Sequence, residues 1–272
     1  MVDKDFMRDL VYGSAVGDAL GVPYEFKEQG TFECVGMAGY GTHNQPEGTW
    51  SDDTSLTLAT CDSIMANEDA DIARDGINTR DMFRRFKSWL NHGTYAIDNN
   101  LFDIGNATYR AITTGKGQNG EWDSGNGSLM RIAPLAAVDG VTREQVMEVS
   151  AITHATRLCK ALCADFVELL VQVHQDPEKG RQIASQRVSG INEDNVRSGG
   201  YVQETFDAAL WCYTMTESYR ECVLKAVNLG HDTDTTACVA GALAAAEYGI
   251  DGIPDEWIVA LRGKDIIEEC IS

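Results

Sequence analysis

The sequence predicts a single all-α domain, and three observations support this prediction. Apolar residues recur every three or four positions through most of the 272 residues, which is the spacing that lines one face of a helix. Proline occurs only 5 times, whereas Ala and Leu are frequent, a composition that favours helices. Strand signals are confined to residues 32–35 and 201–202, and no strand–helix–strand rhythm argues for a Rossmann sheet. Since no linker interrupts the chain, residues 1–272 are expected to form one compact helical bundle.

The predicted helices are defined by apolar residues that share one face. The longest such face, in 158–174, carries Leu162, Phe166 and Leu170. Pro177 stands where a first-turn proline opens a further helix, because its missing N–H is not needed there. In order, the predicted helices are one around residues 6–15, then 51–65, 80–90, 129–138, 143–152, 158–174, the helix opened by Pro177, 205–215, 220–228, 233–248 and 254–261.

The charge balance limits the classes of partner. The chain has 22 basic and 42 acidic residues, a formal net charge of −20. Such an acidic surface repels phosphate backbones and anionic membranes, so general nucleic-acid binding and membrane docking are not expected. If the substrate is a nucleotide, something positive must lie in the site, and bound metal ions would supply it.

The cysteines and the N-terminal segment indicate a cytoplasmic protein. None of the eight cysteines forms a CxxC motif, and Cys159 and Cys163 are one helical turn apart among apolar residues. Cysteines in such surroundings are usually reduced core residues. The first residues contain no apolar stretch of signal-peptide type, and the longest small-apolar run, 237–246, is too short to span a bilayer.

Two segments rich in carboxylates and hydroxyls suggest a metal site. The first, residues 48–55 (GTWSDDTS), places Asp52 and Asp53 together at the start of a predicted helix. One Asp there would cap free backbone N–H groups, but two adjacent carboxylates repel each other unless a cation or a proton offsets the charge. The second, residues 230–236 (GHDTDTT), places Asp232 and Asp234 at the start of a helix of small residues. Capping and metal binding both remain open for each segment taken alone.

The two segments together favour hard cations. All-oxygen ligands without cysteine select Mg, Mn or Ca rather than Zn. Two clusters can share a pair of ions that bridge them. The small residues after Asp234 would let that helix pack deep among the others and bury the cluster near the centre of the domain.

Two further segments contain candidate site residues. In residues 13–26 (GSAVGDALGVPYEF), glycines every fourth position indicate close helix packing, and Glu25 just beyond Pro23 is a candidate general base or a solvated helix end. In residues 123–131 (DSGNGSLMR), a glycine-rich loop runs into a predicted helix, where backbone N–H groups suit a phosphate or form an ordinary turn. His154 near a helix end is either structural or part of the site, and His231–Asp232 lacks the other partners of an HD-type metal site.

The order of these segments resembles the ADP-ribosylglycohydrolase family. GDALGVPYEF, WSDDTSL, GNGSLMRIAPLA, a Thr–His segment and GHDTDTTACVAGALAAA follow one another from about Gly13 to Gly249. The pairing of SDDT with a late GHDTDTT is the most specific match. The resemblance implies a compact all-α fold with a central dinuclear Mg2+ or Mn2+ centre.

The resemblance also implies roles for individual residues. Glu25 and Asp103 are implied as catalytic carboxylates, although Asn106–Ala107–Thr108 after Asp103 departs from the family pattern, and Thr156 stands where some members have a second histidine. The implied metal ligands are Ser51, Asp52, Asp53, Asp232, Asp234 and Thr235. The implied substrate-binding residues are Gly125, Asn126, Gly127, Ser128, Met130 and His154.

The predicted reaction is hydrolysis at the anomeric carbon of ADP-ribose, which would release it from a modified protein or a small acceptor. Arginine is the first expectation for the acceptor; serine, guanidine-like molecules, acetyl esters and nucleic-acid ends stay open, as does the oligomeric state. A phosphohydrolase would use the same ions to cut the diphosphate, and a non-catalytic protein would bind ADP-ribose without cleaving it. Prenyl-diphosphate enzymes also use aspartate clusters, but DDTSL and DTDTT do not have their DDxxD spacing.

Overall fold

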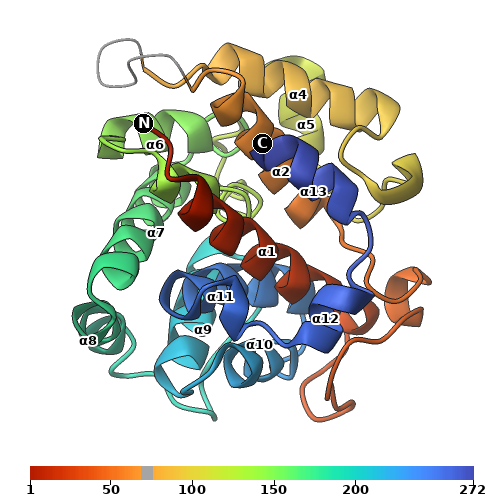
Figure 1. The fold of residues 1–272 in the computed structure, drawn as a ribbon, viewed down its shortest axis with the longest axis vertical. Helices are drawn as coiled ribbons and strands as arrows, with labels where there is room; N and C mark the ends of the chain where they lie inside the picture. The colour runs from red at the N-terminus through yellow and green to blue at the C-terminus, as the bar shows by residue number, and fades with distance from the viewer. Residues whose placement is uncertain (69–75) are drawn as a thin grey trace.

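In the computed structural model, which describes residues 1–68 and 76–272, two long helices form the centre of the molecule. Helix α1 (Lys4–Gly21) crosses the middle of the view in Figure 1, and α11 (Thr233–Tyr248) packs along it. Asp3 starts α1 by accepting a hydrogen bond from the Phe6 backbone N–H at 3.0 Å. Every residue of α11 from Thr233 to Ala246 is buried, which agrees with the predicted deep position of this helix.

Glycines allow the close contact between α1 and α11. A Cβ atom on Gly17 would lie 2.1 Å from the Ala237 carbonyl oxygen, and one on Gly21 would lie 2.3 Å from the Asp234 Cα. Such distances are far below van der Waals contact, so only glycine fits. The prediction that these glycines serve helix packing is confirmed, and the contact brings the end of α1 to the start of α11.

The remaining helices surround this pair. Figure 1 shows α7 and α8 along one side, α4 and α5 at one end, and α10 and α12 at the other. Their buried side chains join one continuous apolar core with those of the central pair. The other helices are α2 (Asp52–Met65), α4 (Thr79–His92), α5 (Asn106–Thr114), α6 (Arg143–Ser150), α7 (Arg157–Gln175), α8 (Pro177–Arg187), α9 (Val202–Thr214), α10 (Tyr219–Val227), α12 (Asp255–Ala260) and α13 (Lys264–Ile271), with 3-10 turns η1 (Val22–Tyr24), η2 (Gly41–His43), η3 (Ile97–Asn99), η4 (Ala133–Ala137) and η5 (Ile250–Gly252).

Most predicted helices are confirmed within a few residues, and 233–248 agrees at both ends. The predicted helix 129–138 is wrong. That segment consists of turns followed by η4, since Pro134 lacks the N–H that a helix interior needs. Helices α5 and α13 were not predicted. Both are short, although Ile267, Cys270 and Ile271 of α13 do lie on one buried face at the helical spacing.

The two strand candidates are also wrong. Across residues 1–68 and 76–272 the backbone forms only isolated bridges, and Tyr201 makes one of them with Gly125. This bridge holds the glycine-rich loop beside the start of α9. The described chain contains no helix with the length and hydropathy needed to cross a bilayer.

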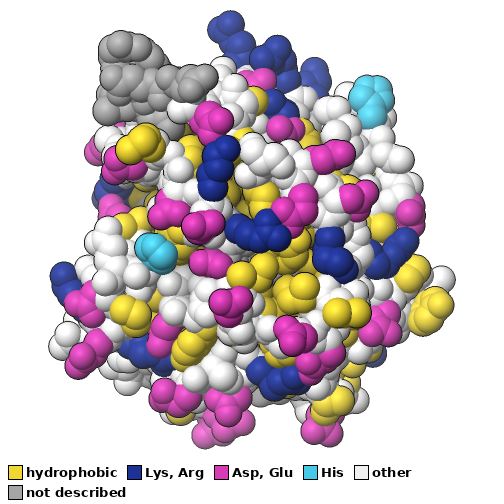
Figure 2. All heavy atoms as spheres, viewed as in Figure 1, with side chains coloured by type: hydrophobic (Ala, Val, Ile, Leu, Met, Phe, Trp, Pro, Cys, Tyr) yellow, Lys and Arg dark blue, Asp and Glu magenta, His cyan; other side chains and the backbone are white. Residues whose placement is uncertain are grey.

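The charges on the surface and the state of the cysteines agree with what the composition indicated. On the face shown in Figure 2, acidic side chains are scattered among basic and apolar ones and do not gather into one patch. All eight cysteines are buried free thiols. One buried cation stands out, because Arg131 is fully buried, donates to Val149 O and Thr153 Oγ1, and stacks 4.5 Å from the Phe86 ring centre.

Candidate active site

A cavity of about 460 Å³ lies where the end of α1 and the starts of α2 and α11 meet. Segments distant in the sequence form its walls. Among the predicted site residues, those on the wall are Glu25, Asp52, Asp53, Asp103, Gly125, Asn126, Gly127, Met130, His154, Asp232 and Thr235. The cavity therefore contains members of the catalytic, metal-binding and substrate-binding sets that the family resemblance implied.

The start of α2 orients the first aspartate pair. Ser51 caps the helix by accepting from the Asp53 N–H at 3.2 Å, and its hydroxyl lies 3.1 Å from Asp53 Oδ2. Asp18 from α1 is fully buried and accepts from the Ser51 N–H at 3.0 Å and from the Thr54 hydroxyl at 2.6 Å. Asp18 accepts hydrogen bonds from backbone N–H groups at this helix end, so the carboxylates of Asp52 and Asp53 are not needed as caps and can line the cavity.

The start of α11 brings the second aspartate pair to the same place. Thr233 donates its hydroxyl to the Gly21 carbonyl at 2.8 Å, which ties this helix end to α1. The Asn126 amide donates to Asp232 Oδ2 at 2.8 Å. Thr235 donates its hydroxyl to Asp53 Oδ2 at 3.3 Å, so the two acidic clusters are in direct contact. The expected convergence of the SDDT and HDTDT segments is thus observed.

Several buried carboxylate oxygens in this cluster have no hydrogen-bond partner. They are Asp53 Oδ1, Asp232 Oδ1 and Asp234 Oδ2. Burial raises the pKa of Asp53 and Asp234 well above the usual range, and the neighbouring carboxylates Asp18 and Glu25 respectively raise it further. An unpaired buried carboxylate is unfavourable unless it is protonated or binds a cation. The residues present therefore fit a hard divalent cation with oxygen ligands.

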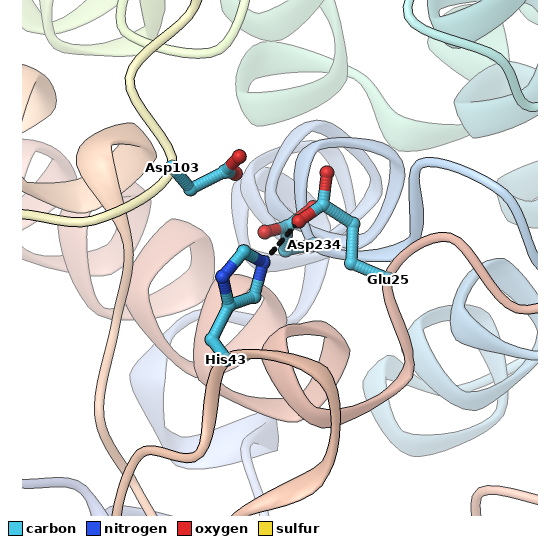
Figure 3. Close-up of side chains that lie close together, drawn as sticks. All are labelled: Glu25, His43, Asp103 and Asp234. Atoms are coloured by element: carbon cyan, nitrogen blue, oxygen red, sulfur yellow. Dashed lines mark hydrogen bonds and ion pairs between the residues drawn. The ribbon is translucent and has the colours of Figure 1, made fainter.

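Glu25 and Asp103 lie beside this cluster. His43, a residue that the sequence did not indicate, lies next to them. Figure 3 shows Glu25, His43, Asp103 and Asp234 pointing toward one another, and their ligand atoms all lie within 4.8 Å of one another. His43 Nε2 forms a short hydrogen bond with Glu25 Oε2. Burial raises the pKa of Glu25 to about 7, against the opposing effect of the His43 bond.

The glycine-rich loop also lines the cavity, where Asn126 contacts Asp232, but it does not start a helix. Residues 127–131 form consecutive turns, so the predicted helix start is wrong, and phosphate binding by the N–H groups of this loop stays a prediction. Gly127 contacts the imidazole of His154, since a Cβ there would lie 2.8 Å from His154 Cε1. Burial, and then Arg131, lower the pKa of His154 to about 3, so its ring is neutral.

Ser128 points away from the cavity. It is fully buried, accepts from the Ser150 hydroxyl at 3.0 Å and lies 3.4 Å from Cys163 Sγ. Ser51 and Asp234 are not among the lining residues but contact the wall residues Asp53 and Thr235, and the Asp234 carboxylate converges with Glu25 and Asp103. The ligand and substrate roles of these residues stay predictions.

Other wall residues are not among the site residues predicted from the sequence. Helix α5 contributes Thr108, whose buried hydroxyl has no partner, and Arg110, which is paired with Asp123. Phe26 and Trp122 also line the cavity and are 69% and 91% exposed. Exposed aromatic side chains beside a polar cavity suit a stacking contact with a planar ligand group. Phe26 closes the GDALGVPYEF segment and Trp122 directly precedes the glycine-rich loop, so both adjoin predicted site residues, but neither aromatic was selected from the sequence.

Comparisons with known proteins agree with this geometry. The chain is 31% identical over 291 aligned positions to the ADP-ribosylarginine hydrolase Tri1 of Pseudomonas putida (strain GB-1), with 97% of this chain and 76% of that protein covered. It is 30% identical over 274 positions to the ADP-ribosyl-[dinitrogen reductase] glycohydrolase of Rhodospirillum rubrum, with 93% and 88% covered.

A solved structure and a family model extend the likeness to nearly the whole chain. A structure described as an ADP-ribosylglycohydrolase-related protein complex superposes with a TM-score of 0.78 at 29% identity, covering 98% of this chain and 96% of that one. The sequence model of the ADP-ribosylglycohydrolase family matches residues 2–272. The all-α fold, the joined acidic clusters and these matches agree: the chain belongs to the ADP-ribosylglycohydrolase family, and the two relatives named above are glycosidic-bond hydrolases.

Proposed function

We propose that this protein hydrolyses the bond at the anomeric carbon of ADP-ribose and releases ADP-ribose from modified arginine on a protein. The observation that carries the proposal is the contact of two acidic clusters, with unpaired buried oxygens, at a cavity large enough for a nucleotide sugar. The names of the relatives from Pseudomonas putida and Rhodospirillum rubrum support the bond type, and the first supports arginine as the acceptor.

Two divalent ions, Mg2+ or Mn2+, fit the ligand set. The ligands that we assign to them are Ser51, Asp52, Asp53, Asp232, Asp234 and Thr235. When bound, the ions would supply positive charge that orients the ribose hydroxyls and stabilises charge as the bond breaks. Ser51, Thr235 and the amide of Asn126 orient the carboxylates, so that these do not have to rearrange when the ions bind.

Two carboxylates are available for proton transfer. Glu25 has a pKa raised to about 7, which lets it accept or give a proton near neutral pH. Asp103 lies within reach of the same point from another segment of the chain. One of them takes the proton from the attacking water or protonates the leaving group, as paired carboxylates do in other glycoside hydrolases.

The part of the wall formed by the glycine-rich loop and His154 holds the nucleotide. The neutral ring of His154 and the close backbone of Gly127 form a surface without negative charge for the diphosphate and ribose. Arg110 lies on the same wall with its charge paired to Asp123, and a diphosphate would have to compete with that carboxylate for it. Trp122 is placed to stack on the adenine.

Product analysis on defined substrates tests the proposal. ADP-ribosylated arginine and serine peptides are incubated with Mg2+ or Mn2+, and the products are separated by chromatography. Intact ADP-ribose, released faster from the arginine peptide, is expected. AMP and ribose phosphate would identify a phosphohydrolase instead, whereas tight ADP-ribose binding without release from any conjugate would identify a non-catalytic binding protein.

A further inference from the structure

We propose that His43 is a positioning residue that fixes the carboxylate of Glu25 for catalysis. The inference rests on the proposed function and adds a residue to it. His43 lies 18 positions from Glu25, on the short turn η2, and its Nε2 bonds Glu25 Oε2 (Figure 3). The bond with Glu25 raises the pKa of His43, which favours the form of the ring that has a proton on Nε2 to donate to the carboxylate.

The backbone of η2 is built to hold this contact. Gly41 packs against Pro23 so closely that a Cβ would lie 2.1 Å from the Pro23 carbonyl oxygen. Thr42 donates its hydroxyl to the Glu25 carbonyl at 2.7 Å. The turn is closed by a hydrogen bond from the Tyr40 N–H to the Gln45 carbonyl. Thr42 therefore holds the main chain of Glu25, and the next residue, His43, holds its side chain.

The same turn contacts the segment that carries the second candidate catalytic carboxylate. The His43 ring lies 5.1 Å from the Phe102 ring, one residue before Asp103. Gln45 accepts a hydrogen bond from the Asn100 amide at 3.1 Å. Since residues 40–45 touch both segments, they set the separation of Glu25 and Asp103, and a small displacement of a reacting group lowers catalysis strongly.

Two substitutions separate the hydrogen bond from ring packing. His43→Phe keeps a ring against Phe102 and removes the donor, whereas His43→Gln keeps an N–H donor and removes the ring. We expect His43→Phe to lower kcat by about tenfold to a hundredfold with KM changed less than about twofold, and His43→Gln to recover most of the loss. If Phe preserves kcat and Gln does not, the residue is a packing element and the proposal is wrong. Circular dichroism and thermal unfolding confirm that both variants are folded.

A double-mutant cycle tests whether His43 acts through Glu25. In a Glu25→Ala background, adding His43→Phe should leave the remaining kcat unchanged, because the group that His43 positions is gone. Full additivity of the two effects would contradict the proposal. Relative activities with Mg2+ and with Mn2+ are compared in the same variants. A changed preference between the ions in His43→Gln would show that the imidazole binds an ion directly and would also contradict it.

A spectroscopic measurement tests the contact without activity. The chain has five histidines, which makes selective 15N labelling of the rings practical. The His43 Nε2–H proton should resonate far downfield in the metal-loaded wild type and lose that shift in Glu25→Ala. An unchanged resonance overturns the proposal even in an active enzyme. Failure of the wild type to release ADP-ribose from any conjugate would instead contradict the proposed function.

Discussion

Thr235 donates its hydroxyl to Asp53 Oδ2 at 3.3 Å and so joins two acidic segments that lie 182 positions apart in the sequence. Neither segment is a site by itself, because each could serve only to cap its helix. Their contact leaves Asp53 Oδ1 and Asp234 Oδ2 buried without partners, and this is the feature that favours cations.

Neutralising one aspartate should remove activity and stabilise the metal-free protein. In Asp234→Asn, we expect ADP-ribose release to fall by about a hundredfold or more, because a group that holds the catalytic charge is lost. The melting temperature in chelator should rise, since one buried like charge is removed. The exposed Asp139→Asn is the control and should change neither quantity. A destabilised but active Asp234→Asn enzyme would contradict the assignment.

Metal ions should stabilise the wild type. At a free ion concentration of about a hundred times Kd, binding adds about 2.7 kcal/mol, which corresponds to roughly 5–10 °C in melting temperature for a chain of this size. Mg2+ or Mn2+ should produce this shift after chelation, and Asp53→Asn should lose most of it. Equal shifts in both proteins would place the ions elsewhere.

The metal-free protein should become less stable as the pH rises. Burial raises the pKa of Asp18 to about 6 and of Glu25 to about 7, above the value of about 4 for unfolded carboxyl groups. Between about pH 4 and 7 the folded state binds more protons than the unfolded state, so the free energy of unfolding falls with rising pH.

Thermal unfolding in chelator at pH 5.5 and 8 measures this effect. The net charge of −20 adds a slope of the same sign, so the comparison that matters is between wild type and Asp234→Asn. The variant should show the smaller slope, because one buried carboxyl no longer titrates. Identical slopes would show that surface charge accounts for the whole effect.

The contact between α1 and α11 should tolerate no side chain at Gly17. In Gly17→Ala the new methyl would meet the Ala237 carbonyl oxygen at 2.1 Å, and we expect a loss of about 3 kcal/mol in unfolding free energy. Gly190→Ala is the matched control, since a Cβ there meets no atom within 4 Å. Denaturant unfolding of both variants gives the comparison. A stable Gly17→Ala protein would mean that α1 and α11 are farther apart.

Trp122 should contribute to binding and not to the chemical step. Its ring is 91% exposed on the cavity wall, and stacking on a base is worth about 1–3 kcal/mol. Trp122→Ala should therefore raise KM by about tenfold with little change in kcat. Tyr109→Ala removes another exposed ring, one outside the residues of the cavity wall, and should leave both constants unchanged. A reduced kcat in Trp122→Ala would show a role beyond stacking.

The sequence predicted the parts of the site whose chemistry is local. Paired aspartates with hydroxyl neighbours at a helix start indicate a metal site, and the small residues along 233–248 predict a buried helix. The wrong helix at 129–138 has a local cause that the sequence already showed, because Pro134 lacks the N–H that a helix interior needs, and its loss removes the expected helix N-terminus from the glycine-rich loop. The orientation of Ser128, which turns into the core toward Ser150, depends on tertiary packing and could not be predicted.

His43 was missed for a different reason. It lies in a loop without periodicity, and its only functional feature is a hydrogen bond to a residue 18 positions away. A histidine between Thr42 and Asn44 carries no motif that indicates a site. Thr108 and Arg110 were missed likewise, because α5 was not predicted and its cavity-facing side chains belong to no metal or catalytic pattern.

The central claim is that the joined acidic clusters hold the ions needed for hydrolysis. The most direct measurement follows ADP-ribose release from an ADP-ribosylated arginine peptide by chelated protein while Mn2+ or Mg2+ is titrated back. We predict no release in chelator and recovery to a plateau as the ions are added, with Asp53→Asn inactive throughout. Full activity of the chelated wild type would contradict the account.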